Sequence, residues 1–292
     1  MSDVKLFYSP GACSLAPHIA LEETGGPYVP VLVSVAKGEQ RQPDYLKINP
    51  KGRVPALADG DLVITENPAV LYYIAQKFPD AGLWPRSLAA RARALEWCAF
   101  IASGVHVAFA HIRRVERYAT TEQGKADVVA KGRISAREHW EMVERKLGDE
   151  PWGAGADYSI ADPYLLTFWT WGRGQVLGYD MAKDFPRWTT HARRMAQRPA
   201  VQRAFAREPV ETEKVQPSAK DDGQADPEGT PKRGLPDADL AGVTMKNAEV
   251  EGQHAQDKGD KQGVNPPNFS EGKQHGGCGC GDSGRAPGGG VH

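Results

Sequence analysis

The sequence predicts an α/β domain, an all-helical domain and a flexible tail, in that order along 292 residues. Three observations predict this division. Short apolar strands alternate with helical patterns in about the first 80 residues, long helical repeats follow, and the last part of the chain is nearly free of aromatic side chains. We therefore expect domains at 1–79 and 88–208, a linker at 80–87 and a disordered tail at 209–292.

The first domain has the pattern of a βαβ unit followed by a hairpin and a helix. The expected elements are strand 4–8, helix 13–23, strand 28–35, a helical turn at 44–48, strands 54–58 and 62–64, and a helix from Thr65 to Phe78. Asp59-Gly60 suits a two-residue hairpin turn, Thr65 suits a helix cap, and Pro79 ends the last helix. Together these elements predict a mixed four-stranded sheet covered by helices.

The second domain is predicted to be helical throughout. The expected helices are 88–118, 122–147, one opening at Ser159 and running through Trp169, 186–197 and 199–207. Ser159-Ile160-Ala161-Asp162 resembles a capping box, which opens the third and most buried of them. Cys98 lies on the apolar stripe of the first helix, so we expect it to be a packing residue.

The tail differs from the rest of the chain in composition. All seven Trp and all nine Tyr lie before residue 189, and Phe269 is the only aromatic residue after Glu208. Such a segment cannot bury enough apolar surface to offset its ordering entropy. It carries 9 Lys or Arg and 14 Asp or Glu, a net charge of −5, which leaves +4 for the folded part of a chain of net charge −1. Neither part has a dense basic stripe, so nucleic acid is not an expected partner.

Cysteine usage and hydropathy indicate a cytoplasmic protein. No signal region and no apolar run of membrane-spanning length are evident, so no membrane association is expected. The four cysteines are too few for a disulfide framework, which fits a reducing compartment: Cys13, Cys98, Cys278 and Cys280. Cys278 and Cys280 lie near His275, but a Gly-rich loop lacking a fourth ligand predicts no metal site.

The first candidate site is the segment Tyr8 to Leu15 (YSPGACSL), where Cys13 leaves a strand and enters a helix. Free backbone N–H groups and the positive helix end are expected to face its sulfur and to favour thiolate over thiol. The same pocket could stabilise either Cys13 itself or the thiol of a bound ligand. The alternative is a small buried cysteine that merely begins a helix.

The second and third candidates are Val54-Pro55 and Glu66-Asn67. A cis peptide before Pro55 would turn the backbone of Val54 toward an extended ligand; the alternative is an ordinary edge-strand proline. Glu66 and Asn67 begin a helix, where a carboxylate and the helix end can hold the ammonium and carboxylate of a small zwitterion. The alternative for them is simple complementation of the helix dipole.

Together the three segments resemble the motifs of a known family. The stretch 6–208 resembles the glutathione transferases, and FYSPGACSL (Phe7 to Leu15) resembles the signature of the bacterial beta class. The resemblance continues in NPKGRVPAL (Asn49 to Leu57), in Thr65-Glu66, in Glu96-Trp97 before His106, and in the capping box at Ser159. It implies a thioredoxin-like first domain, a helical-bundle second domain, and glutathione bound as a cosubstrate between them, with no further cofactor.

The resemblance also assigns roles to residues. Cys13 matches the cysteine that contacts glutathione sulfur and can form a mixed disulfide with it, and the neighbouring Ser14 hydroxyl could substitute as donor. Val54, before the expected cis-Pro55, matches the residue whose backbone pairs with the cysteinyl unit. The pair that binds the γ-glutamyl end is matched by Glu66 and Asn67, although Asn67 stands where the family more often has Ser, Gly or Ala.

His106 matches a helical-domain histidine that faces the ligand, whereas a lone histidine on an apolar helix face is usually structural. The chain has Ala99 where the family often has Asn, and Val107 where it often has Lys. These departures predict a more apolar pocket for the electrophile. Trp169 and Trp171 are expected in the core, with no role as a ligand platform.

The sequence therefore predicts a homodimeric glutathione transferase whose second substrate is a small electrophile or a disulfide. One alternative is a monothiol disulfide reductase that acts through Cys13, since no second cysteine lies three residues away. Another is a non-catalytic, protein-binding member of the same fold. That alternative predicts loss of the ligand residues, yet Cys13, Val54-Pro55 and Glu66 are all present, so the enzyme is favoured.

Overall fold

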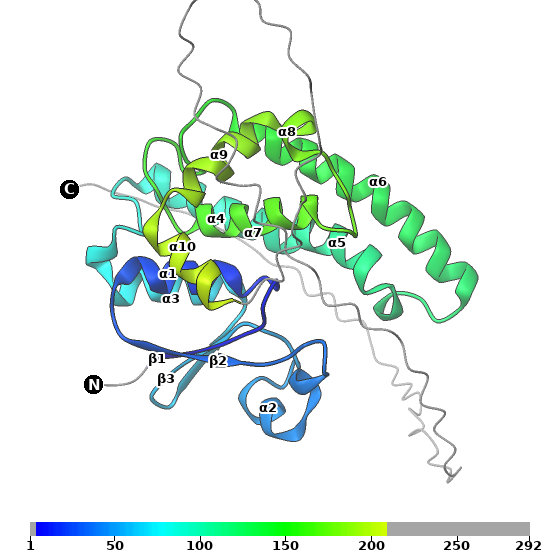
Figure 1. Ribbon diagram of the computed structural model, residues 1–292, viewed down its shortest axis with the longest axis horizontal. Helices are drawn as coiled ribbons and strands as arrows, with labels where there is room; N and C mark the ends of the chain where they lie inside the picture. The colour runs from blue at the N-terminus through cyan, green and yellow to red at the C-terminus, as the bar shows by residue number, and fades with distance from the viewer. Residues whose placement is uncertain (1–3, 209–292) are drawn as a thin grey trace, which may run out of the picture. The chain divides into compact units, whose positions relative to one another are not determined.

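The computed structural model describes residues 4–208 and confirms the predicted class, a mixed sheet with helices followed by an all-helical part (Figure 1). The expectation of a disordered tail at 209–292 lies outside the described residues. The strands are β1 (Val4–Tyr8), β2 (Tyr28–Leu32), β3 (Ala56–Asp59) and β4 (Leu62–Thr65). The helices around them are α1 (Leu15–Thr24), α2 (Pro43–Ile48) and α3 (Asn67–Lys77), with 3-10 turns at Glu39–Arg41 and Pro79–Ala81.

The sheet has the order β2-β1-β3-β4, with β1 parallel to β2 and antiparallel to β3. The predicted hairpin is confirmed: Asp59 pairs with Leu62, and Gly60 has φ 59°, a left-handed conformation that glycine adopts at no steric cost. Helices α1 and α3 lie on one side of the sheet and α2 on the other (Figure 1). The central strand β1 is therefore the best buried, and its Leu6 is fully inaccessible.

Two predicted element boundaries near the site are wrong. Strand β2 ends at Leu32, because the chain turns at Ser34, whose backbone N–H donates to the Glu39 carboxylate at 2.7 Å. Thr65 does not cap the following helix. Glu66 occupies the N-cap position of α3 and has φ 75°, the only positive φ of a non-glycine residue among those described.

The helical part contains α4 (Leu88–Phe100), α5 (His106–Arg113), α6 (Glu122–Leu147), α7 (Ala161–Arg173), α8 (Met181–Asp184), α9 (Pro186–Ala196) and α10 (Pro199–Arg207). The predicted helical stretch 88–118 is present as far as Arg113 but is not uniform. A π-helical turn at Ile101–Val105 interrupts it, and a 3-10 turn, Val115–Arg117, follows α5. His106 therefore begins a new helical segment directly after a widened turn, a feature often found at functional sites.

Helix α7 is the buried helix that the capping-box pattern predicted. Every residue from Ala161 to Gly172 is buried. Asp162 accepts hydrogen bonds from the backbone N–H of Ser159 at 2.7 Å and of Gly153 at 2.8 Å, while the Ser159 hydroxyl accepts from Ala161 N–H. The capping box differs in detail from the predicted pattern. The Ser159 hydroxyl caps the first helical turn at the Ala161 N–H, and the N-cap residue of α7 is Ile160.

The last helix, α10, returns to the first domain and packs on α1 (Figure 1). Ion pairs join the two surfaces: Arg203 and Arg207 contact the Glu22 carboxylate at 2.7 and 2.8 Å, and Arg198 contacts Glu23 at 2.5 Å. The end of the described chain is thereby fixed beside the helix that follows Cys13.

One helical stretch, Leu88–Arg113, is long and apolar enough to cross a membrane by length and composition, contrary to the expectation that no run approaches that length. Its inward side chains belong to the protein core, among them Trp97, Cys98 and Ile101, all fully buried. The expected packing role of Cys98 is thereby confirmed. A buried helix of a folded core satisfies the same length and composition test, so this observation is weak evidence for a membrane span.

Candidate functional site

Cys13 lies in the turn between β1 and α1. Its side chain is 8% exposed, and its Sγ donates a hydrogen bond of 3.6 Å to the backbone carbonyl of Val54. Burial raises the pKa of the Cys13 thiol to about 12, and the backbone and Asn67 hydrogen bonds only partly offset this. The expectation that this setting favours the thiolate is therefore wrong for the ligand-free protein: Cys13 is a neutral thiol that donates.

The backbone of this turn explains the difference. The N–H groups of Ala12, Leu15 and Ala16 donate to backbone carbonyls three residues earlier at 3.0, 3.1 and 3.4 Å, so these three are not available to the sulfur. Ser14 is fully buried, and its hydroxyl accepts from Ser9 N–H at 3.1 Å and donates to Ser9 C=O at 3.2 Å. This geometry gives Ser14 a part in closing the turn.

The loop before β3 presents Val54 to Cys13. The Val54-Pro55 peptide is cis, as predicted. The preceding carbonyl, of Arg53, accepts hydrogen bonds from the Tyr45 hydroxyl at 2.8 Å and from the Asn49 side-chain amide at 2.6 Å. Two side chains from α2 and its C-terminal cap thus fix this loop, so that the Val54 carbonyl faces the sulfur.

Glu66 and Asn67 lie at the start of α3, and their side chains differ in environment. The Glu66 carboxylate is 61% exposed and forms an ion pair with Lys51. The Asn67 side chain is buried, and its amide donates to the backbone carbonyl of Cys13 at 3.0 Å. Its carbonyl oxygen is buried without a hydrogen-bond partner among the described residues, so it remains able to accept one.

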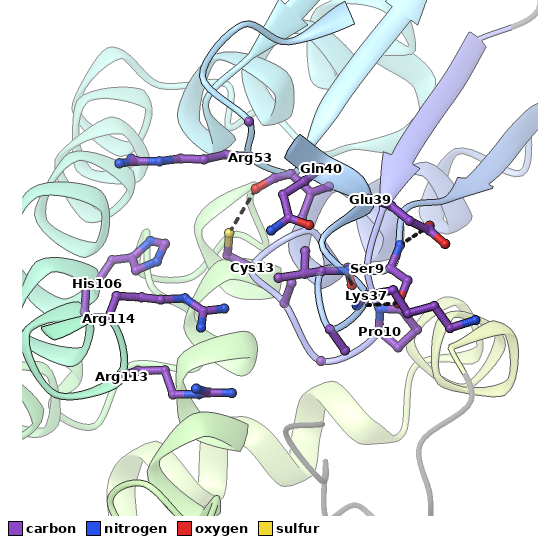
Figure 2. Close-up of a pocket in the computed structure, with 18 of the residues that line it drawn as sticks. Ser9, Pro10, Cys13, Lys37, Glu39, Gln40, Arg53, His106, Arg113 and Arg114 are labelled. Atoms are coloured by element: carbon purple, nitrogen blue, oxygen red, sulfur yellow. Dashed lines mark hydrogen bonds between the residues drawn. The ribbon is translucent and has the colours of Figure 1, made fainter. Parts of the chain in front are cut away.

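A cavity of about 660 Å³ opens between the Cys13 turn, the Val54 loop and helices α5 and α7 (Figure 2). Of the predicted site residues, Cys13, Val54 and His106 line this cavity. Ser14, Pro55, Glu66 and Asn67 do not belong to its lining. The structure therefore brings together residues from three separate parts of the chain, and the α3 pair lies behind the lining, where Asn67 contacts the backbone of Cys13.

His106 faces the cavity from the first turn of α5 (Figure 2). Its ring contacts Phe168 and Trp171 edge-on, with ring centroids 5.4 and 5.2 Å away. Burial, together with the positive charges of Arg53 and Arg117, lowers the pKa of His106 to about 4. At neutral pH this histidine is uncharged, so it can exchange hydrogen bonds with a ligand but supplies no positive charge.

Two residues of the site were not predicted. Trp171, expected only in the core, lines the cavity, stacks near Phe109 with centroids 4.5 Å apart, and donates from its indole to the Gly11 carbonyl at 3.0 Å. Glu208 is fully buried and accepts from the Gly11 N–H at 3.2 Å and pairs with His18 Nδ1 at 2.9 Å. The turn that carries Cys13 is thus held at Gly11 from both sides by residues of the helical part.

The expected apolar character of the electrophile pocket stays a prediction, because Ala99 and Val107, on which it rests, are not part of the cavity lining. Five cationic residues line it: Lys37, Arg53, Arg113, Arg114 and Arg117. Glu39 is the only carboxylate among the lining residues, and it already accepts the Ser34 N–H. The cavity is therefore strongly positive.

Comparison with known proteins agrees with this geometry. The family model for the glutathione S-transferase N-terminal domain matches residues 2–76, and that for the C-terminal domain matches residues 101–199. Glutathione S-transferase GstA of Escherichia coli O157:H7 is 36% identical over 208 residues, which make up 70% of this chain and 98% of that protein. The chain belongs to the glutathione S-transferase family.

Solved structures of other glutathione S-transferases match the same region. A glutathione transferase homologue from Sulfitobacter, crystallised with bound glutathione, is 38% identical with a TM-score of 0.66, covering 71% of this chain and 99% of that one. The bacterial beta-class enzyme of Sphingomonas chungbukensis is 37% identical with a TM-score of 0.60, covering 70% and 98%. The present transferase thus has the thioredoxin-like and helical domains of this family.

Proposed function

We propose that this transferase binds glutathione with its sulfur beside Cys13 and presents that sulfur to a small electrophile in the cavity. The observation that carries the proposal is the pairing of the Cys13 thiol with the Val54 carbonyl at the wall of a cavity of about 660 Å³. A cavity of this volume is in the range of small-molecule sites. The glutathione bound in the Sulfitobacter relative supports the choice of ligand.

In this proposal, the backbone of Val54, oriented by the cis-Pro55 bond, pairs with the cysteinyl unit of glutathione, and Glu66 and Asn67 hold its γ-glutamyl end. Cys13 donates a hydrogen bond to the ligand sulfur, as it donates to Val54 in the free protein. Ser14 shapes the turn. Neutral His106 contacts the ligand from the opposite wall and orients it.

The chemical step is a displacement. The thiol of glutathione loses its proton to water, and the thiolate attacks the electrophilic carbon. A carbon–sulfur bond forms while the bond to the leaving group breaks, and that group departs with the bonding electron pair. The protein contributes orientation and electrostatic stabilisation of the attacking thiolate, which the Cys13 hydrogen-bond donor and the Arg53 guanidinium supply from the sheet side of the cavity.

Glu66→Ala is expected to weaken glutathione binding by roughly tenfold to a hundredfold, the cost of one charged hydrogen bond. The effect should lie near the lower limit, because Glu66 is exposed and its ion pair with Lys51 competes with the ligand ammonium. Calorimetry measures the affinity directly, and Asp61→Ala, an exposed carboxylate in the hairpin turn, is the matched control. Unchanged affinity in Glu66→Ala would remove Glu66 from the site.

We also propose that residues 1–208 suffice for folding and conjugation, with division at 1–79 and 88–208, and that the protein is a cytoplasmic homodimer. A chain ending after Glu208 is expected to keep its melting temperature and turnover, because the composition of the removed part supports no core. The cut must spare Glu208, which holds the Cys13 turn. A decrease of many degrees in melting temperature on truncation would contradict this domain division.

The proposed homodimer is tested by light scattering, and a monomer mass would contradict it.

A further inference from the structure

The helical wall of the cavity carries a cluster of arginines that the proposed function leaves unused. Arg113 is the last residue of α5, Arg114 is its C-cap, and Arg117 lies in the 3-10 turn that follows. Arg53 lines the same cavity from the Val54 loop. Figure 2 shows Arg113 and Arg114 extending from the side of His106, and Arg53 from the other side of the cavity. The three arginines of the helical wall come from five consecutive positions of the chain.

Arg114 and Arg117 are short of negative partners. Within residues 4–208, neither side chain forms an ion pair or a hydrogen bond, although Glu116 partly compensates their charge. Arg114 is half-buried. Burial and the neighbouring arginines lower the pKa of both guanidinium groups, which nevertheless stay charged at every physiological pH. Keeping like charges together without counterions destabilises the free protein, so the arrangement fits an anionic ligand.

Glutathione does not account for this cluster in the proposed binding mode. Its sulfur and cysteinyl unit lie at Cys13 and Val54, and its γ-glutamyl end lies toward Glu66. Lys37 and Arg53 belong to the sheet domain, on the same side as Val54, and are available to the glycyl carboxylate. The helical wall faces the sulfur from the opposite domain, where the second substrate must approach.

We infer that the second substrate is an aromatic electrophile bearing a carboxylate or sulfonate, with Arg114 and Arg117 as its specificity-determining residues. The inference rests on the proposed function and names the substrate class for that same site. Guanidinium groups bind carboxylates and sulfonates through paired hydrogen bonds. The aromatic surface beside them, formed by Phe109 and Trp171, suits a planar ring.

The experiment compares chlorodinitrobenzoate with its uncharged counterpart, chlorodinitrobenzene, each conjugated to glutathione by the full-length protein. In both reactions chloride leaves with its bonding pair, the carbon–sulfur bond forms, and the thiol proton goes to water. Values of kcat/KM are divided by the uncatalysed rate constants to remove intrinsic reactivity. The variants are Arg114→Met, Arg117→Met and the double variant, with Arg145→Met on α6, a largely exposed residue, as control.

Each single variant is expected to lose roughly tenfold in kcat/KM for the benzoate, and the double variant about a hundredfold. In all three variants we expect an unchanged KM for glutathione and an unchanged rate with chlorodinitrobenzene. The melting temperature should stay the same or rise, because repulsion between the arginines is relieved. With glutathione saturating in both reactions, added salt should slow the benzoate reaction more than the chlorodinitrobenzene reaction. Equal losses with both chlorides, or a glutathione KM that rises by the same factor, would overturn the inference while leaving conjugation in place. Absence of glutathione binding in calorimetry would instead overturn the proposed function and the inference with it.

Discussion

Cys13→Ala is expected to lose mixed-disulfide reduction by roughly a thousandfold or more while keeping conjugation within about tenfold of the original rate. Disulfide exchange needs the Cys13 sulfur to form a bond, and alanine has no atom to replace it. Conjugation uses the sulfur of glutathione, so it loses only a neutral hydrogen-bond donor. Such a donor contributes about 1 kcal/mol, which corresponds to a several-fold rate effect.

The ionisation of Cys13 carries this prediction. With a pKa raised to about 12 by burial, Cys13 remains protonated at neutral pH. A second thiolate beside that of glutathione would also be opposed by like charge. Cys13 is therefore expected to react slowly with iodoacetamide, with a rate that still increases above pH 9.

Assays of aryl-halide conjugation and mixed-disulfide reduction at matched glutathione test this assignment. Cys98→Ala, which removes a buried thiol outside the cavity lining, is the control for loss of a cysteine as such. Cys13→Ala/Ser14→Ala tests whether the Ser14 hydroxyl, which closes the turn onto Ser9, can replace the missing donor. A thousandfold loss of conjugation in the single variant, with glutathione still bound, would show that Cys13 has a different role.

Glu208→Ala is expected to lower the free energy of unfolding by about 3 kcal/mol, since it leaves a buried imidazole and a buried backbone N–H without an acceptor. For a folded part of this size, that loss corresponds to a decrease of roughly 6–12 °C in melting temperature. Burial raises the pKa of Glu208, and hydrogen bonds from His18 and Gly11 partly offset the rise. Among the described residues, the Glu208 carboxyl group is the only hydrogen-bond partner of His18 Nδ1 and of the Gly11 N–H.

The same substitution is expected to affect catalysis, because Gly11 belongs to the turn that carries Cys13. Thermal unfolding and glutathione affinity are measured together on Glu208→Ala, on Glu208→Gln, which keeps one acceptor, and on the exposed control Glu150→Ala. The losses of melting temperature and of glutathione affinity should be largest in Glu208→Ala, smaller in Glu208→Gln and smallest in Glu150→Ala. A melting temperature within a degree of the original in Glu208→Ala would contradict the role given to this residue.

Local sequence signals predicted much of the fold. The bounds of α6, Glu122–Leu147, follow from its helical repeat and from the Thr121 side chain, which accepts the Gly124 N–H at 3.1 Å. The Asp59-Gly60 turn was predicted because its geometry is fixed by two residues. The π turn at 101–105 was not, since its apolar residues continue the helical spacing on both sides. Nor was α8, which is four residues long and too short to show a period.

The parts of the site that lie in short contiguous motifs were predictable because their signals are local. The contacts between segments that are distant in the sequence were not predictable. The cis bond at Val54-Pro55 and the position of Cys13 follow from short motifs. Glu208 and Trp171 contact Gly11 across 197 and 160 residues, so no local pattern indicates their contacts. The pKa of Cys13 depends on burial by distant segments, which outweighs the helix-end effect that sequence alone suggested.

Ultraviolet titration of the thiolate absorbance in the intact protein saturated with glutathione tests the central claim most directly. Cys13 and Cys98 do not ionise below about pH 10. Subtracting the absorbance of the ligand-free protein and of free glutathione removes the contributions of Cys278, Cys280 and unbound ligand, so the remaining thiolate absorbance between roughly pH 5 and 9 reports the sulfur of bound glutathione. The Cys13 donor and the Arg53 guanidinium favour the charged form of that sulfur, so its pKa should lie at least about one unit below the value near 8.5 of an unperturbed thiol. A bound glutathione that titrates like the free peptide, or no binding at all, would contradict the account.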